Sequence, residues 1–306
     1  MAARYLIGID LGGTNLKVAL LDLNYKIKSK QFLPTQSYNN KEKLINAICY
    51  LVNKIIKDNY LNKKDIYAIG IGLPGPIDAE HGVVHSLTNI AGWRNVKLRN
   101  ILEKKLALKV FIDNDVKVMT LAEFKLGSAR KFKNSLCLTL GTGVGGAFIL
   151  DGKIFRGTNN AAGEIGHLLL NEDGPKCNCG GKACLETYIG NSRIQEFARK
   201  VFKRNITLEE VSLLAKKQNK LAIDVWKRVG FCLGLALTGV TNILNLDAVV
   251  IGGGVSKAGK ILFDEVRKTI RSRGMHVQAK HVKVLKAKLG NEAGFIGAAI
   301  LAREGF

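Results

Sequence analysis

The hydrophobic and polar positions in the first half of the chain predict an α/β layer. Short apolar runs predict strands at 5–10, 16–23 and 26–35, and the apolar residues of 41–59 then recur at helical spacing. Beyond them the pattern predicts, in order, a strand at 65–77, a helix at 95–106, a strand at 109–115 and a helix at 116–127. Three strands followed by alternating helices and strands are typical of a sheet covered by helices.

The second half repeats this plan. Two β-rich runs flank a glycine turn within 135–154, long helical patterns follow, and further strands are predicted at 247–254 and 282–289. The last apolar helix, at 291–305, is short enough to return to the first half. The chain is therefore predicted to contain two repeats of one α/β unit.

The length of 306 residues also favours two domains, since one domain averages roughly 150 residues. We expect a small N-terminal α/β lobe formed by 1–113 plus 292–306. The larger C-terminal lobe is expected to comprise 114–291.

Cysteine usage indicates an intracellular protein. Cys49, Cys137 and Cys232 lie singly within apolar stretches, as reduced and buried thiols do. The first residues reach a glycine turn after too few apolar positions for a secretory signal. The apolar run at 231–240 is too short to span a membrane, so we expect a buried helix there and a cytoplasmic protein.

The chain is strongly basic, with 47 Lys and Arg against 25 Asp and Glu and a net charge of +22. The excess is largest between Lys257 and Lys288. Such a charge favours polyanionic partners, including nucleotides, polyphosphate and nucleic acid. The alternative is a lysine-rich solvated surface, which is favoured because no aromatic residues interleave with the cations as single-strand binding requires.

Two glycine-rich turns occupy equivalent places in the two halves. DLGGTN at 10–15 lies between predicted strands, so its backbone N–H groups can face an anion, and Asp10 can hold a hydrated Mg²⁺ beside phosphates. LGTGVGG at 140–146 fits G-x-G-x-x-G, but a strand follows it, which excludes a Rossmann fingerprint. A plain hairpin explains either turn alone. Together the two turns indicate a pair of phosphate loops.

A third glycine run, VVIGGGVS, ends the predicted strand at 247–254, where α/β sheets bind ligands. It either permits close packing of the next helix or contacts the adenosine of a nucleotide. The chain contains neither a Walker motif nor the protein-kinase motif set, which excludes those phosphoryl-transfer classes.

The segment FIDNDV places Asn114 and Asp115 where a strand passes into a helix. Asp115 is either a simple helix cap or a general base that takes a proton from a hydroxyl while a γ-phosphoryl group is held in line. In the second case Asn114 orients the acceptor.

A cysteine cluster follows in GEIGHLLLNEDGPKCNCGGKACLE. His167, Cys177, Cys179 and Cys184 provide one imidazole and three thiolates, a complete tetrahedral donor set for a structural zinc ion. The spacing C-x-C-x₄-C differs from the C-x-x-C of redox proteins. A zinc ion bound there would make the loop rigid. It would thereby fix three candidate sugar-binding residues on one side of the site, namely Glu164, His167 and Glu186.

Seven motifs occur here in one order: DLGGTN, LPGP, NDV, LGTGVGG, AAGEIGH, CNCGGKACLE and VVIGGGVS. Together they resemble the bacterial ROK family of repressors and sugar kinases, from about Tyr5 to the C-terminus. The resemblance implies the two-lobed actin-like, ribonuclease-H-like ATPase fold, with duplicated βββαβαβα units and an inserted zinc loop. It also implies ATP with Mg²⁺ as donor, structural Zn²⁺, transfer to a hexose 6-hydroxyl, and a homodimer.

The resemblance assigns roles to individual residues. Asp115 is the catalytic base. The implied sugar contacts are Asn89, Asn114, Asp115, Glu164, His167 and Glu186. The implied nucleotide contacts are Asp10, Gly12, Gly13, Thr14, Gly141, Thr142, Gly143, Gly252, Gly253 and Gly254, and the implied zinc ligands are His167, Cys177, Cys179 and Cys184.

The chain departs from the family pattern at two positions. Lys117 stands where asparagine is frequent, and its cation either lowers the pKa of Asp115 or points to solvent. Ala183 stands where glycine is frequent before the last cysteine, and alanine there is expected to require a negative φ.

A glucokinase is the expected activity. Kinases of N-acetylmannosamine, N-acetylglucosamine or fructose, and a polyphosphate-dependent enzyme, are close variants. A sugar-sensing transcriptional repressor is the alternative of another class. Repressors of the family carry a helix-turn-helix module before the first phosphate loop, whereas Asp10 is almost the first feature here, so we expect no nucleic-acid partner.

Overall fold

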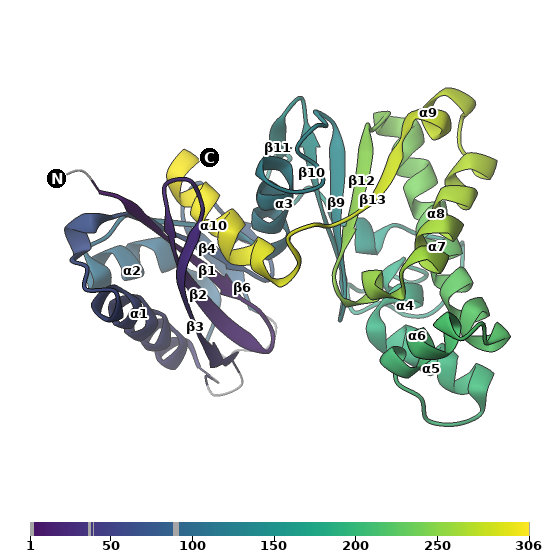
Figure 1. Cartoon of the computed structure of the whole chain (residues 1–306), viewed down its shortest axis with the longest axis horizontal. Coiled ribbons are helices and arrows are strands. Elements are labelled where there is room, and N and C mark those ends of the chain that lie inside the picture. Colours follow the sequence, from purple (N-terminus) through teal and green to yellow (C-terminus); the bar gives the residue numbers. More distant parts are fainter. Residues whose placement is uncertain (1–2, 36–37, 39, 88–91, 306) are drawn as a thin grey trace. The chain divides into compact units, whose positions relative to one another are not determined.

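The computed structural model describes residues 3–35, 38, 40–87 and 92–305. The chain forms two compact units, which Figure 1 shows with their helices and strands. Unit 1 comprises residues 1–127, 156–162 and 289–306, and unit 2 comprises residues 128–155 and 163–288. Both units are mixed α/β structures, which confirms the predicted fold class.

Unit 1 is built on a five-stranded sheet of order β3-β2-β1-β4-β8. The strands are β1 (Tyr5–Leu11), β2 (Asn15–Asp22), β3 (Ile27–Pro34), β4 (Ile66–Leu73) and β8 (Val110–Asn114). The first three strands are antiparallel, whereas β1, β4 and β8 are parallel. A small antiparallel sheet joins β5 (Ile77–Asp78), β6 (Val83–Ser86) and β7 (Arg94–Val96).

Helices cover both faces of the unit 1 sheet. On one face, α1 (Lys41–Asp58) and α2 (Leu98–Leu106) bury their apolar residues against alternate residues of β1 and β2. On the other face, α10 (Ala293–Glu304) lies directly on β1 and β4, beside α3 (Asp115–Lys125). A Cβ atom at Gly8 or Gly70 would overlap the backbone carbonyl of Phe295 or Ala298, so these glycines permit the close approach of α10.

Unit 2 repeats the same sheet order, β11-β10-β9-β12-β13. Its strands are β9 (Ser135–Leu140), β10 (Val144–Leu150), β11 (Lys153–Phe155), β12 (Ala248–Gly252) and β13 (Lys283–Lys286). Its helices are α4 (Glu186–Ile189), α5 (Asn191–Phe202), α6 (Leu208–Lys216), α7 (Lys220–Leu244), α8 (Lys260–Arg273) and α9 (His276–His281). The predicted buried helix around 231–240 is the second half of α7, whose residues enter the core with Trp226.

The boundary between the units differs from the expected one at residue 113. Helix α3 belongs to unit 1 because it packs on β4 and α10. A Cβ atom at Gly72 would lie 2.5 Å from Val118 Cγ2, and one at Gly297 would overlap the Val118 carbonyl. No helix in the described part of the chain is both long and apolar enough to cross a bilayer.

Candidate active site and metal centre

The carboxyl ends of three parallel strands bring Asp10 and Asp113 to one edge of the unit 1 sheet. Asp10 of β1 is in register with Gly72 of β4, and Gly72 is in register with Asp113 of β8. Because adjacent strands lie ~4.8 Å apart, the backbones of Asp10 and Asp113 are separated by about 10 Å. Asp115 follows at the start of α3, so the first glycine turn and the candidate base lie at the same end of the sheet, where such sheets bind ligands.

The first glycine turn is a short hairpin loop between β1 and β2. The Gly12 N–H donates to the Asn15 carbonyl at 2.9 Å, and Thr35 donates its N–H to Thr14 and its hydroxyl to Gly12. The Asp10 carboxylate accepts a hydrogen bond from the Lys17 ammonium at 3.0 Å. One carboxylate completed by waters is a usual donor set for Mg²⁺, which Asp10 fits.

The second and third glycine runs pack against each other in unit 2. The Gly141 N–H donates to the Gly143 carbonyl at 2.9 Å, which closes the turn between β9 and β10. Gly253 has a φ of +82°, and a Cβ atom there would overlap the Leu140 backbone. Gly253 is therefore required by close packing. A Cβ atom at Gly141 or Gly254 would meet nothing within 4 Å, so these two positions leave open space for a ligand.

Glu186 connects the second glycine turn to the cysteine segment. Its carboxylate accepts a hydrogen bond from the Val144 N–H at 2.9 Å. A Cβ atom at Gly143 would lie 2.6 Å from Glu186 Oε2, so glycine at 143 allows this approach. Glu186 is the first residue of α4 and follows Cys184 by two residues, which places it between the glycine turn and the cysteine cluster.

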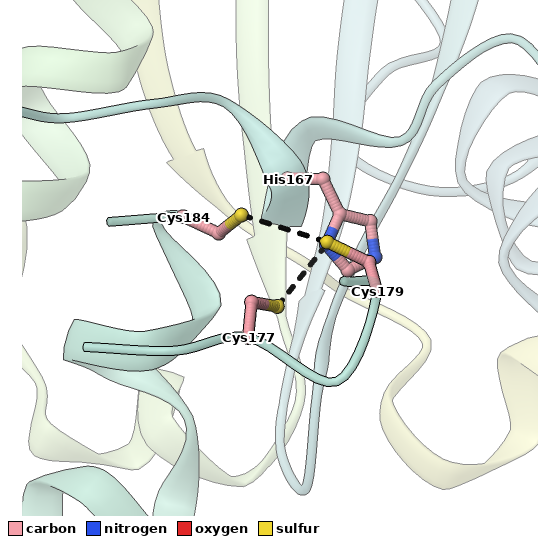
Figure 2. A group of neighbouring side chains, drawn as sticks. All are labelled: His167, Cys177, Cys179 and Cys184. Carbon is pink, nitrogen blue, oxygen red and sulfur yellow. Dashed lines mark hydrogen bonds between the residues drawn. The ribbon is translucent and has the colours of Figure 1, made fainter. Parts of the chain in front are cut away.

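His167, Cys177, Cys179 and Cys184 converge in unit 2 (Figure 2). Their ligand atoms all lie within 4.8 Å of one another. Cys179 Sγ lies 3.7 Å from Cys184 Sγ, and Cys177 Sγ lies 3.6 Å from His167 Nδ1. A tetrahedron with ~2.3 Å Zn–S bonds and ~2.0 Å Zn–N bonds has S···S edges of about 3.8 Å and S···N edges of about 3.5 Å. The two measured separations are close to these edges, so the arrangement of the four side chains is compatible with a bound zinc ion.

Backbone hydrogen bonds give the cysteine segment its shape. The Cys177 N–H donates to Gly181, and the Ala183 N–H donates to Pro175, so the segment folds back on itself. Burial, with the neighbouring thiols, raises the pKa of Cys184 to about 12. Hydrogen bonding from the Gly181 amide lowers the pKa of Cys179. Binding of a metal ion must therefore displace the Cys184 proton.

Ala183 corrects one expectation. It was expected to have a negative φ, but its φ is +57° and its side chain is buried. Left-handed backbone costs a residue with a Cβ atom roughly 1–2 kcal/mol, and the hydrogen bonds of Ala183 to Pro175 and Leu170 hold it in place. The loop thus keeps a conformation that suits glycine and tolerates alanine.

The histidine directs its two ring nitrogens to different neighbours. Nδ1 faces Cys177, and Nε2 lies 4.0 Å from Glu164 Oε2. The Glu164 side chain is 71% exposed, so its carboxylate is accessible to a ligand. Asn89 lies outside the described residues.

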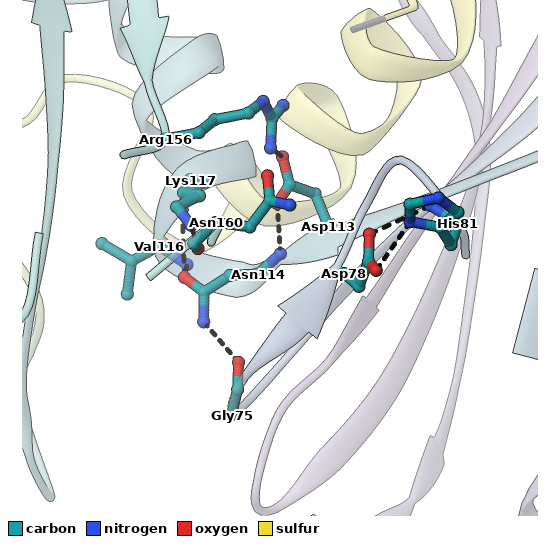
Figure 3. Close-up of polar contacts among 9 residues, drawn as sticks. All are labelled: Gly75, Asp78, His81, Asp113, Asn114, Val116, Lys117, Arg156 and Asn160. Carbon is teal, nitrogen blue, oxygen red and sulfur yellow. Dashed lines mark hydrogen bonds and ion pairs between the residues drawn. The ribbon is translucent and has the colours of Figure 1, made fainter. Parts of the chain in front are cut away.

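The candidate base region of unit 1 is densely hydrogen-bonded (Figure 3). Asn114 is the N-cap of α3: its Oδ1 accepts from the N–H groups of Val116 and Lys117, and its Nδ2 donates to the Gly75 carbonyl at 3.1 Å. Asp115 is the first residue of α3, where the helix dipole favours a carboxylate. Asn114 therefore caps α3 and holds the backbone at Gly75, in addition to its expected contact with the sugar.

Asp113 and Arg156, which pair with each other near the start of α3, were not singled out from the sequence. Asp113 is fully buried and pairs with Arg156, whose Nη1 lies 2.6 Å from Asp113 Oδ2. Burial raises the pKa of Asp113, and the Arg156 charge offsets part of this effect. Lys117 is 4% exposed and donates to the Asn160 carbonyl, so it does not point to solvent. The pattern FRG, an arginine directly after a strand, was the available signal for Arg156.

Comparisons with known proteins agree with the motifs. The chain is 33% identical to the glucokinase of Halalkalibacterium halodurans, a match that covers 99% of this chain and 96% of that enzyme. It is 30% identical to the xylose repressor of Caldicellulosiruptor bescii, over 95% of this chain and 76% of the repressor.

Among solved structures, the chain is similar to a ROK family glucokinase from Streptomyces griseus in complex with glucose and AMPPNP. The TM-score is 0.83 at 29% identity, and the match covers 98% of this chain and 100% of that one. The family model described as the ROK family matches residues 6–305. The chain therefore belongs to the ROK family.

Proposed function

We propose that the protein is an ATP-dependent glucokinase, which transfers the γ-phosphoryl group of ATP to the 6-hydroxyl of glucose. One observation carries the proposal: Asp115 begins α3 at the sheet edge that also bears the glycine hairpin of Asp10, in a chain matched by a glucokinase over nearly its full length. A carboxylate beside a phosphate loop is the arrangement that phosphoryl transfer to a hydroxyl requires.

The mechanism uses the chain's own residues for positioning and proton transfer. Asp115 accepts the proton of the sugar 6-hydroxyl as that oxygen attacks phosphorus, a contribution of roughly 10²- to 10⁴-fold to the rate. The backbone N–H groups of the two glycine turns bind phosphate oxygens. Asp10 would hold a hydrated Mg²⁺ ion beside the phosphates. When bound, ATP with Mg²⁺ supplies the phosphoryl group and neutralises its charge.

The sugar is held by polar side chains of the cysteine segment. Glu164, His167 and Glu186 pair with adjacent hydroxyls, and Asn89 and Asn114 add amide contacts. His167, Cys177, Cys179 and Cys184 hold structural Zn²⁺ and so fix the first three of these residues. The spacing of the four ligand atoms supports this part of the proposal. A cytoplasmic location and a homodimer, both expected from the sequence, belong to the same proposal.

The experiment that tests the function is an ADP-release screen with purified protein across glucose, mannose, fructose and N-acetylhexosamines. Glucose should give the highest kcat/KM with ATP. Higher kcat/KM with N-acetylmannosamine, N-acetylglucosamine or fructose would replace glucose as the substrate. Product formed with polyphosphate in place of ATP would change the donor, and absence of turnover with every sugar would refute a kinase and favour the repressor class.

A further inference from the structure

Two cationic side chains connect a loop that is distant in sequence to the end of β8 and the start of α3. Arg156 pairs with Asp113 at 2.6 Å, and the Lys117 ammonium donates to the carbonyl of Asn160 (Figure 3). In each contact one partner is buried, Asp113 or Lys117, and the other, Arg156 or Asn160, is partly exposed. The loop of residues 156–162 belongs to unit 1, although the residues on both sides of it belong to unit 2.

Lys117 lies where both the helix dipole and burial disfavour a positive charge. It is the third residue of α3, where the helix dipole disfavours positive charge, and its burial removes water from the ammonium group. The positive charge of Lys117 is stabilised by the hydrogen bond to the Asn160 carbonyl and by the carboxylate of Asp113. Removing one member of such a cluster leaves the remaining buried charges uncompensated and destabilises the arrangement.

The 156–162 loop presents a preformed acceptor to Lys117. The Ala162 N–H donates to the Arg156 carbonyl at 3.0 Å and closes the loop. Gly157 and Asn160 have φ values of +70° and +61°, so the backbone turns sharply at both residues. Glu164 follows Asn160 by only four residues, which places the clamped carbonyl and a proposed sugar ligand on one short stretch of backbone.

We propose that Lys117 and Arg156 are positioning residues for the reaction: by holding the 156–162 loop against the end of β8 and the first turn of α3, they fix the Asp115 carboxylate for proton transfer. This inference rests on the proposed kinase function. A displacement of about 1 Å in a reacting group can lower a rate roughly 100-fold. Loss of the clamp therefore lowers kcat and leaves binding of sugar and nucleotide nearly intact.

The first test replaces Lys117 with Met, which keeps the length of the side chain and removes its charge and hydrogen-bond donor. The Lys117→Met variant should lose roughly 10- to 100-fold in kcat, with the KM for ATP and the Kd for glucose within about twofold of wild type. The matched control is Lys125→Met on the same helix, where an exposed ion pair with Glu304 at 2.7 Å is lost and kcat should not change. A Lys117→Met enzyme with wild-type kcat overturns the proposal.

A second pair of variants acts on the acceptor and decides the question if Lys117→Met does not fold. Asn160→Gly adopts a φ of +61° without strain and keeps the carbonyl in place. Asn160→Val disfavours that φ, because a β-branched residue rarely adopts left-handed backbone, and so displaces the carbonyl. The valine variant should reproduce the kcat loss, and the glycine variant should stay near wild type. Equal kcat for both overturns the clamp, whereas a wild-type protein without turnover refutes the kinase function itself.

Discussion

Replacing Gly143 with Ala should weaken sugar binding through Glu186. The new Cβ atom would lie 2.6 Å from Glu186 Oε2, well inside van der Waals contact, so the carboxylate must move away. It then loses the 2.9 Å hydrogen bond from the Val144 N–H. Hydrogen bonds to charged groups contribute roughly 1.5–3 kcal/mol. Gly143 has no positive φ, so backbone strain does not add to this cost.

The lost free energy appears as weaker glucose binding if the sugar requires Glu186 in its present position. Since 1.4 kcal/mol corresponds to a factor of ten, the Kd for glucose should rise about 10- to 100-fold. Calorimetric titration with glucose, without nucleotide, measures this directly and avoids effects on phosphate binding. The matched control is Gly239→Ala within α7, where a Cβ atom meets nothing within 4 Å. That variant should bind glucose normally and gain up to ~1 kcal/mol of stability.

A glucose Kd within twofold of wild type for Gly143→Ala would refute the placement of Glu186 in the sugar site. A loss of stability without a change in the glucose Kd would also refute that placement. It would show that the Glu186 carboxylate stabilises only the glycine turn between β9 and β10.

Two further predictions concern the zinc ligands and the third glycine run. Cys179→Ser should abolish the one equivalent of zinc expected per chain by elemental analysis and raise the KM for the sugar; wild-type protein free of zinc would dismiss the metal site. Gly253→Ala should destabilise the fold by more than about 2 kcal/mol in denaturant unfolding, because the Cβ atom overlaps the Leu140 backbone at a φ of +82°. Gly254→Ala, which meets nothing within 4 Å, should unfold close to wild type, and equal losses for both would contradict the packing argument.

Local patterns were sufficient to predict much of the fold and the convergence of the three cysteines with His167. Alternating apolar runs predicted the β-hairpins around the glycine turns at 10–15 and 140–146. The repeated order of predicted elements agrees with the five-stranded sheets of the two units, whose strand orders correspond. The cysteine spacing predicted the cluster because its four ligands lie within 18 residues of chain and converge through short backbone turns.

Contacts between distant segments were not predictable in the same way. The boundary at residue 113 missed the packing of Val118 against Gly72 and Gly297, which assigns α3 to unit 1. The environment of Lys117 depends on Asn160, 43 residues later, and nothing in the local sequence of α3 indicates that partner. Periodicity determines which face of a helix is buried, whereas a charge buried by a remote loop requires the tertiary structure.

The most direct test of the account is the rate of glucose 6-phosphate formation from ATP and glucose by wild-type protein and by Asp115→Asn. The wild-type enzyme should form the product, and the variant should bind glucose normally but form it roughly 10²- to 10⁴-fold more slowly. Wild-type turnover by Asp115→Asn would contradict the assignment of Asp115 as the base.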